Sequence, residues 1–242
     1  METSRGLRSL ATSGSRPLSA VEEQPLRKLI QEMPYERPLA AGRYVYSQDG
    51  APTGAVESWH LSAAMEGYRF LRVDYDASEA SGDHALYHLV LDAEERPQRL
   101  KFRFFRRGLQ ISGDLLFAED TALLSRTINS RQLDAETAFS PATAFWFPAS
   151  SGLSLLGDGP AESAALTLKP DDNFALKPTT LALSKGAPQT ISLMGRQIET
   201  TLVSARWDHE QQTIWFDEYH WPVRVERESL AALESRYVRY TV

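Results

Sequence analysis

Residues 42–61, GRYVYSQDGAPTGAVESWHL, carry the pattern that decides the fold. Two runs of alternating apolar and polar residues flank a turn at Gln48-Asp49-Gly50. An Asp-Gly pair between such runs is the sequence signal of a tight β-hairpin. Successive side chains of a strand point to opposite faces, so the pattern predicts an antiparallel hairpin with one buried face. The return strand places on that face Ala55, Glu57, Trp59 and Leu61.

The same rhythm extends over most of the chain on the C-terminal side of this hairpin. Short alternating runs occupy residues 68–76, 84–105 and 109–129, and they resume from residue 163 towards the C-terminus. Many short strands separated by turn residues are typical of a sandwich or barrel. We therefore expect a mainly β protein in which residues 20–242 form a single domain, one large curved antiparallel sheet or half-barrel.

Three segments depart from this pattern. Residues 1–19 are polar and predict a disordered leader, although a targeting presequence would have a similar composition. Residues 20–33 have the apolar spacing of an amphipathic helix, which would dock on the sheet or bind a partner. Residues 136–160 combine Pro and Gly with the apolar clump Phe145-Trp146-Phe147, so we expect a loop or short helices that plug the concave face.

Composition excludes several classes of protein. The formal net charge of −6 argues against a general affinity for nucleic acids. With no Cys, the chain has neither disulfides nor thiolate metal sites. No apolar run approaches the roughly eighteen residues of a membrane-spanning helix, and no secretory apolar segment is present at the start. We expect a cytoplasmic protein without a cofactor, whose oligomeric state the sequence leaves open.

No metal site is expected either. His84 and His88 are four residues apart, but the alternation around them is that of a strand. Four residues of strand span roughly 13 Å, too far for one ion to take both side chains directly.

Residues 205–225 contain three Trp, two His, two Asp and two Glu, a density that raises the question of catalysis. Strand parity divides the stretch into a hairpin with a wet turn at 208–210 and a second turn at 217–221. General acid–base chemistry by His220 with Asp217 is physically possible in the second turn. Turns are also polar simply because they face water. No catalytic residue is assigned.

The one concentrated basic run comprises residues 96–107, interleaved with Phe. Arg99, Lys101 and Arg103 alternate on one strand face and are candidates for binding an anionic group. An exposed strand face whose charges keep the sheet soluble explains the same pattern.

Aromatic side chains form the remaining candidate site. A strongly curved sheet has a concave face that a helix, loops or a ligand must fill. Core packing accounts for most of these side chains, and the others would line a groove. The candidates for ligand contact are Tyr44, Tyr46, Trp59, Tyr75, Phe102, Phe104, Phe145, Trp146, Trp207, Trp215, His220 and Trp221.

Two hairpins resemble those of a known group of half-barrel proteins. That group includes bacterial lipoprotein-localisation factors, domains considered to bind glycolipids and several uncharacterised families. The first hairpin has a strand-turn-Gly-x-x-Glu-x-Trp pattern with Gly54 and Glu57, and the second has Trp215, Asp217 and Pro222 in a W-x-D, turn, Pro pattern. The resemblance covers residues 40–228 in outline. It implies a half-barrel that holds an apolar or lipid-like molecule, with no catalytic residue to transfer.

Three functions follow as hypotheses. The first is non-catalytic binding of an apolar or amphipathic small molecule in the concave face. The second is a cofactor-free enzyme acting on a hydrophobic substrate in the same groove, which requires His60, His88 or His220 to face the groove beside an acid. The third is a protein-interaction module that uses edge strands or the helix at residues 20–33.

Overall fold

One curved sheet makes up most of the part of the chain that the structure describes. The computed structural model describes residues 33–156 and 159–239. The first eight strands are β1 Arg37–Gln48, β2 Ala51–Ala63, β3 Arg69–Ala77, β4 Asp83–Leu91, β5 Pro97–Arg106, β6 Leu109–Phe117, β7 Thr121–Ile128 and β8 Arg131–Ala138. The other seven are β9 Ala144–Trp146, β10 Glu162–Lys169, β11 Ala175–Leu193, β12 Arg196–Trp207, β13 Glu210–Phe216, β14 Pro222–Arg227 and β15 Leu230–Arg239. Within these described ranges there are also three short 3-10 turns: η1 Met65–Gly67, η2 Ser151–Leu156 and η3 Pro170–Asp172.

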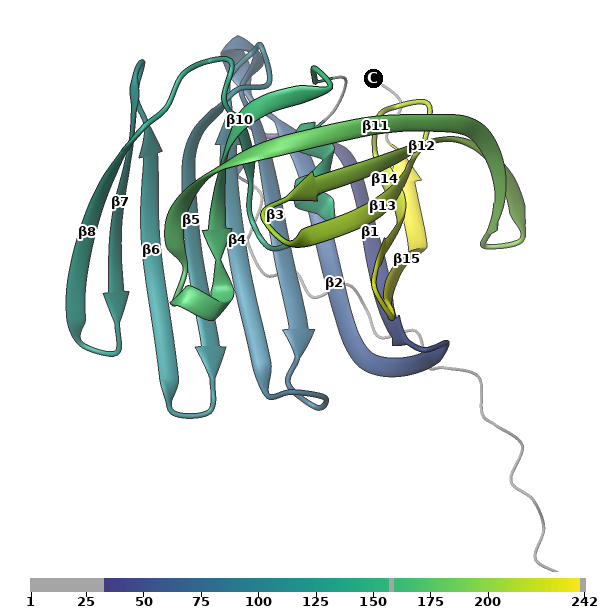
Figure 1. The fold of residues 1–242 in the computed structure, drawn as a ribbon, viewed down its shortest axis with the longest axis horizontal. Coiled ribbons are helices and arrows are strands. Elements are labelled where there is room, and N and C mark those ends of the chain that lie inside the picture. The colour runs from purple at the N-terminus through teal and green to yellow at the C-terminus, as the bar shows by residue number, and fades with distance from the viewer. Residues whose placement is uncertain (1–32, 157–158, 240–242) are drawn as a thin grey trace, which may run out of the picture.

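Two meanders meet at the chain's first and last strands. β1 to β8 form one antiparallel series, and β10 to β15 form a second (Figure 1). β15 pairs antiparallel with β1 and joins the series into a single sheet of 15 strands. β9 is parallel to β10, and among the described residues β8 and β9 each pair with only one strand. The prediction of one large, mainly antiparallel sheet is confirmed, and the sheet is not closed into a barrel.

The hairpin that opens the sequence forms as predicted. Asp49 and Gly50 link β1 to β2 with φ angles of 50° and 79°, the left-handed pair that a two-residue hairpin turn requires. Ala55, Glu57 and Trp59 are buried on the inner face. Strand alternation therefore places the apolar face of this hairpin on the concave inner side of the curved sheet, which we call the curl.

Two glycines let this sheet bend tightly around its core. A Cβ on Gly113 in β6 would overlap the ring of its cross-strand neighbour Phe102. A Cβ on Gly42 in β1 would meet the indole of Trp59 and the carboxylate of Glu234. At both positions only a residue without a side chain leaves room for the buried aromatic ring.

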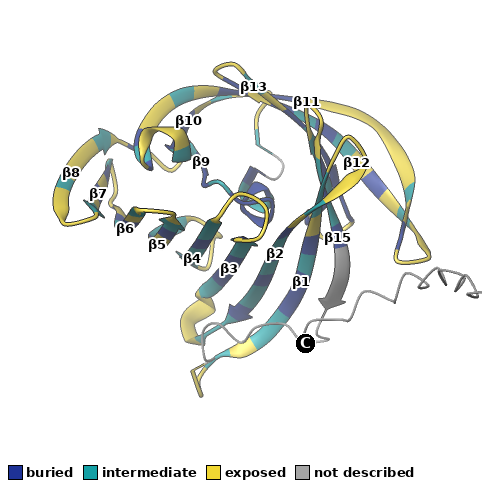
Figure 2. Cartoon of the chain, turned by 90° about the horizontal axis from the view of Figure 1, so that it is seen from below, coloured by how far each residue is buried: buried dark blue, intermediate teal, exposed yellow. Residues whose placement is uncertain are grey.

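β9, η2 and the residues that join them lie inside the curved sheet (Figure 2). Figure 2 shows η2 inside the wrapped sheet and shows buried residues on the inward-facing strands. Phe145, Trp146 and Phe147 are all buried there. The sequence predicted a loop or short helices at this place. The structure has a 3-10 turn and, in addition, the three-residue strand β9.

Two predictions concern residues outside this description. The leader at 1–19 lies outside the described residues, as does the helix predicted at 20–33 except for its last residue, Met33. No helix within 33–156 and 159–239 is long and apolar enough to cross a membrane.

Candidate functional site

β9 and η2, which we call the plug, fill part of the interior of the curved sheet, and the region beside them, the filled region, is tightly packed. Trp146 of β9 and Trp207 of β12 lie with ring centroids 5.0 Å apart, and Phe145 and Leu156 pack next to them. The remaining void in this region is about 10 Å³, which holds at most about one water molecule. The filled region is packed like an ordinary protein core.

A cavity of about 240 Å³ opens elsewhere in the same interior. It lies where β3, β5 and β14 end and where β4 and β15 begin, so it forms a mouth of the curl. Aromatic and short apolar side chains from both meanders line it. Those that bear on its chemistry are Tyr46, Tyr75, Tyr87, Phe104, Trp146 and Phe174.

A buried carboxylate behind this cavity holds the plug in place. Glu57 is fully buried, and its two oxygens accept hydrogen bonds from the backbone N–H groups of Ser150 and Ser151, both at 2.8 Å. The Tyr46 hydroxyl donates to Glu57 Oε2 at 2.6 Å and lies 2.8 Å from Ser150 Oγ. The Glu of the Gly-x-x-Glu-x-Trp pattern thus anchors η2 to β2.

Three polar groups face the cavity without a protein partner. Within the described part of the chain, the side chains of Tyr75, Tyr87 and Gln212 make no hydrogen bond. Tyr87 and Gln212 are nevertheless buried, with 2% and 5% of their surface exposed. Their polar atoms are not fully enclosed, so they can bond to water or to a ligand that enters the cavity.

Burial and the nearby carboxylates keep both phenols protonated. Burial followed by the charges of Asp83 and Glu57 raises the pKa of Tyr75 to about 12. Burial followed by the charge of Glu57 raises the pKa of Tyr87 well above its ordinary value. At neutral pH both hydroxyls can therefore donate as well as accept hydrogen bonds.

Ion pairs occupy the charged groups at the rim. Arg106 donates to both carboxylate oxygens of Asp83, at 2.6 and 2.8 Å. Its guanidinium also lies 5.4 Å from the centre of the Phe104 ring. Arg227 lies 3.4 Å from Glu210, which also pairs with Lys169 at 3.1 Å. Each rim cation thus has a carboxylate beside it.

Phe174 separates the cavity from the core below it. Its ring stacks on Phe102 at 5.0 Å and lies 5.1 Å from Phe104, so the β10–β11 turn reaches across to β5. Asn173 and Phe174 have φ angles of 51° and 58°, a left-handed conformation that is uncommon for a bulky residue. Arg126 of β7 donates to the Asn173 carbonyl at 2.6 Å and holds this turn against the other meander.

The structure brings some of the predicted aromatic residues together and separates others. Tyr46, Tyr75, Phe104 and Trp146 line the cavity. Phe102, Phe145 and Trp207 are packed in the core, as are Trp59 and Trp221, whose rings lie 4.1 Å apart. Tyr44 is fully buried and donates to the Pro222 carbonyl at 2.6 Å.

Trp215 and His220 lie away from the cavity. Trp215 packs with Leu193 and Val223 in a separate cluster and donates to Gln189 at 2.9 Å, beneath the β11–β12 hairpin. His220 is exposed in the β13–β14 turn. The carboxylate of Asp217 accepts the backbone N–H groups of Tyr219 and Trp221 in that turn, which is a structural role.

None of the residues that line the cavity is a histidine, among those that the structure describes. On β2, His60 alternates with the inward-facing Trp59 and points to the outer face. His88 takes the outer face of β4 in the same way, and burial followed by the charge of Arg72 lowers its pKa to about 4. The placement that the enzyme hypothesis requires is therefore not found in the described residues.

The basic run lies on the outer face of β5, above an open trough of about 540 Å³. Arg99 is held by both oxygens of Asp114, and Lys101 lies 3.8 Å from the same carboxylate. Arg103 makes no ion pair with any described residue. Anion binding by Arg99, Lys101 and Arg103 stays a prediction.

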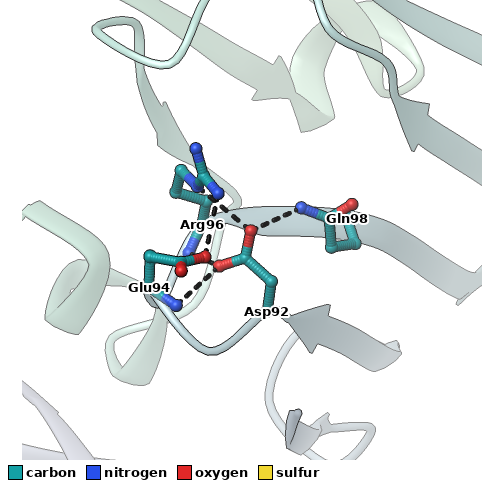
Figure 3. A network of polar contacts seen from close by, with 4 residues as sticks. All are labelled: Asp92, Glu94, Arg96 and Gln98. Atoms are coloured by element: carbon teal, nitrogen blue, oxygen red, sulfur yellow. Dashed lines mark hydrogen bonds and ion pairs between the residues drawn. The ribbon is translucent and has the colours of Figure 1, made fainter. Parts of the chain in front are cut away.

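The first arginine of that run belongs to the β4–β5 turn. Figure 3 shows Asp92 accepting hydrogen bonds from the backbone of Glu94 and from the side chains of Arg96 and Gln98. Arg96 also donates to Glu94 at 2.8 Å. Arg96 thus stabilises the turn of the β4–β5 hairpin.

The described residues contain no cluster of metal-ligating side chains. Within residues 33–156 and 159–239, no three His, Asp or Glu side chains gather closely enough to hold a metal ion. The cavity offers phenol, amide and aromatic groups, which suit an organic molecule better than an ion.

Sequence reasoning missed three residues of the site. Tyr87 lies on the apolar side of the alternation in HALYHLVL, which was its only signal. Gln212 is the last residue of the polar stretch DHEQQ and resembles a turn residue, but β13 begins at Glu210 and turns Gln212 inward. Phe174 has no signal, since its position depends on an uncommon turn.

Comparisons with known proteins support the fold. No protein-family model matches the chain, and no curated protein matches it in sequence. Among solved structures, it is similar to the crystal structure of a β-barrel-like protein of the domain of unknown function DUF1849 from Brucella abortus. The TM-score is 0.52 at 11% identity, over 85% of this chain and 99% of that chain. This likeness concerns the fold alone, and the resemblance to lipoprotein-localisation factors stays a prediction.

Proposed function

We propose that this protein binds an apolar or amphipathic small molecule, without catalysis, in the cavity at the mouth of the curled sheet. One observation carries the proposal: the buried side chains of Tyr87 and Gln212 face the cavity without a hydrogen-bond partner among the described residues. A ligand with a polar group would satisfy them. A β-barrel-like fold with a buried aromatic cluster is compatible with such a role.

The walls of the cavity favour a ring or a short apolar body. Phe104, Trp146 and Phe174 supply aromatic surface, and Ala85 and Ala149 supply space. Sites for small ligands usually enclose about 300–1,000 Å³, so 240 Å³ admits one ring or the end of a longer molecule. The remainder of such a ligand would extend through the open mouth.

The two other hypotheses have less support. The Tyr46–Ser150 hydroxyl pair lines the cavity, but burial and the Glu57 charge raise the pKa of Tyr46 well above its ordinary value, which opposes its use as a base. A protein-interaction role would use the exposed edge of β8, and gel filtration at two concentrations tests it. The cytoplasmic location stays a prediction.

A ligand panel tests the proposal directly. Protein freed of co-purified lipid is mixed with small aromatic alcohols, fatty alcohols and glycolipids, and Trp fluorescence and melting temperature are recorded. We expect some members to raise the melting temperature and to change the fluorescence, because Trp146 lines the cavity. The absence of any response across the panel would contradict the proposal.

A pair of alanine variants locates the binding. Ala85→Leu fills part of the cavity and is expected to weaken binding about tenfold or more. Ala165→Leu puts the same side chain into the 10 Å³ void of the filled region, where overpacking costs about 1–3 kcal/mol and leaves affinity unchanged. Equal affinities for Ala85→Leu and the wild type would place the ligand elsewhere.

A further inference from the structure

Resting on the proposed function, we infer that the cavity selects ligands whose buried end is uncharged, carrying a hydroxyl or amide group, and that Glu57 is the residue that excludes carboxylates and phosphates. The class of ligand is thus a neutral ring or amphiphile. Fatty acids and phosphorylated lipids, which an aromatic-lined half-barrel would otherwise suggest, are disfavoured.

Glu57 is a buried carboxylate that has no cation beside it among the described residues. Its partners are two backbone N–H groups and the Tyr46 hydroxyl. A backbone N–H can only donate, so both carboxylate oxygens act as acceptors. Across the described residues, no Lys, Arg or His forms an ion pair with Glu57, whose surface is fully buried. In a medium of low polarity its charge acts over a longer range than it would in water.

The field of this charge reaches the cavity. It contributes to the raised pKa values of Tyr46, Tyr75 and Tyr87, the three phenols that line the site. The negative charge that disfavours a phenolate at these tyrosines also disfavours a ligand's carboxylate beside them. An anionic head would enter a region of negative potential.

The rim supplies no compensation for an anionic ligand. The Arg106 guanidinium is engaged by both oxygens of Asp83, and Arg227 lies beside Glu210. Recruiting Arg106 would separate Asp83 from its cation, and recruiting Arg227 would break its pair with Glu210, so each costs an existing ion pair.

A ligand with a cationic head group gains little from the charge of Glu57. Both Glu57 oxygens already accept hydrogen bonds and lie behind Tyr46 and Ser150, so an ammonium group cannot pair with them directly. It would lose its hydration for contact with phenol, amide and aromatic groups, without a carboxylate to pair with directly. The groups that remain open are Tyr75, Tyr87 and Gln212, which match a neutral donor and acceptor.

Three probes with one common body test the inference. We choose 3-phenylpropanamide, 3-phenylpropanoate and 3-phenylpropylamine and measure each by calorimetry with the wild-type protein at neutral pH. The amide is expected to bind about tenfold or more tighter than either charged probe. Tighter binding of the carboxylate or the amine would overturn the inference and leave the proposed function standing. If none of the three binds and the wider panel is also silent, the proposed function itself fails.

Variants identify the groups responsible. Glu57→Gln removes the charge with little change in shape. We expect it to reduce the difference in affinity between 3-phenylpropanamide and 3-phenylpropanoate by about fivefold or more. Tyr87→Phe removes one hydroxyl that has no protein partner among the described residues. We expect it to weaken the binding of 3-phenylpropanamide about three- to tenfold and to leave the binding of 3-phenylpropanoate nearly unchanged.

A matched tyrosine serves as the control. Tyr44→Phe removes a buried hydroxyl that bonds to the Pro222 carbonyl and does not line the cavity, so it should change stability without changing the order of the probes. If Glu57→Gln does not fold, Tyr87→Phe decides the question by itself. An unchanged amide affinity in Tyr87→Phe would overturn the assignment of the head group to this cavity.

Discussion

The filled region of the interior and the cavity at its mouth are built from the same kinds of residue, yet one is core and the other is an open site. In the filled region, Trp146 and Trp207 pack to leave about 10 Å³. At the mouth, Tyr75, Tyr87 and Gln212 surround about 240 Å³. Aromatic content alone therefore does not distinguish a core from a binding site.

Two features account for the difference. Alanines at 85, 149 and 232 leave room at the mouth, and the hydroxyl and amide groups around them find no protein partner among the described residues. In the filled region the plug supplies Phe145 and Leu156 to occupy the space. The position of the plug, fixed by Glu57, decides which part of the interior stays open.

The largest effect is expected in the filled region. Trp207→Ala removes a fully buried indole and leaves a cavity, which costs about 3–5 kcal/mol of the free energy of unfolding. Urea unfolding followed by circular dichroism measures it. A loss below about 1 kcal/mol would show that this region is not tightly packed.

A smaller effect is expected at Phe174, which lies on the boundary. Phe174→Ala should cost about 3 kcal/mol, the lower end of the range for a buried phenylalanine, and enlarge the mouth cavity, so that ligands with a second ring bind more tightly. Asn173→Gly in the same turn is the control, because glycine relieves the left-handed backbone and should stabilise the protein by up to about 1 kcal/mol. An unchanged ligand preference in Phe174→Ala would show that the Phe174 ring does not limit the size of the ligand.

The smallest effect is expected at the rim and depends on pH. The hydrogen bonds from Arg106 lower the pKa of Asp83 in the folded state. The stability that this pair contributes is thus present above the unfolded pKa, near 4, and is lost as the pH falls through the folded value. Because the pair is partly exposed to solvent, its contribution should be under about 1 kcal/mol.

Asp83→Asn tests this expectation. The variant should lack the corresponding part of the acid-induced fall in stability, as measured by urea midpoints at pH values on both sides of about 4. Its ligand affinity should stay close to that of the wild type at neutral pH, provided that the head group is neutral. A gain in affinity for a carboxylate probe would show that Arg106 can receive an anion once it is released.

Local patterns in the chain were enough for much of the fold. The Asp49-Gly50 turn, the inward Ala55-Glu57-Trp59 face and the strand around His84 and His88 all form as predicted, because each depends on backbone geometry within a few residues. The pairing of β15 with β1 and the short strand β9 were not predicted, since both join segments far apart in the sequence.

The candidate site was only partly accessible to the same reasoning. Tyr46, Tyr75, Phe104 and Trp146 were among the predicted ligand contacts, and they do line the cavity. Trp215 has the same composition and parity signals but faces the opposite side of the sheet, under a hairpin. Periodicity tells which residues share a face but does not tell which face lies inside the curl.

The amino-acid sequence alone thus determined a mainly β, antiparallel architecture and a set of aromatic faces, because alternation and turn residues act over short distances. Only the tertiary structure decided where that interior is solid and where it is open. That outcome depends on Glu57 capturing the backbone of Ser150 and Ser151, and on Phe174 crossing between the meanders. Such contacts join residues distant in the sequence, where side-chain volume and unsatisfied hydrogen bonds are settled by the whole fold.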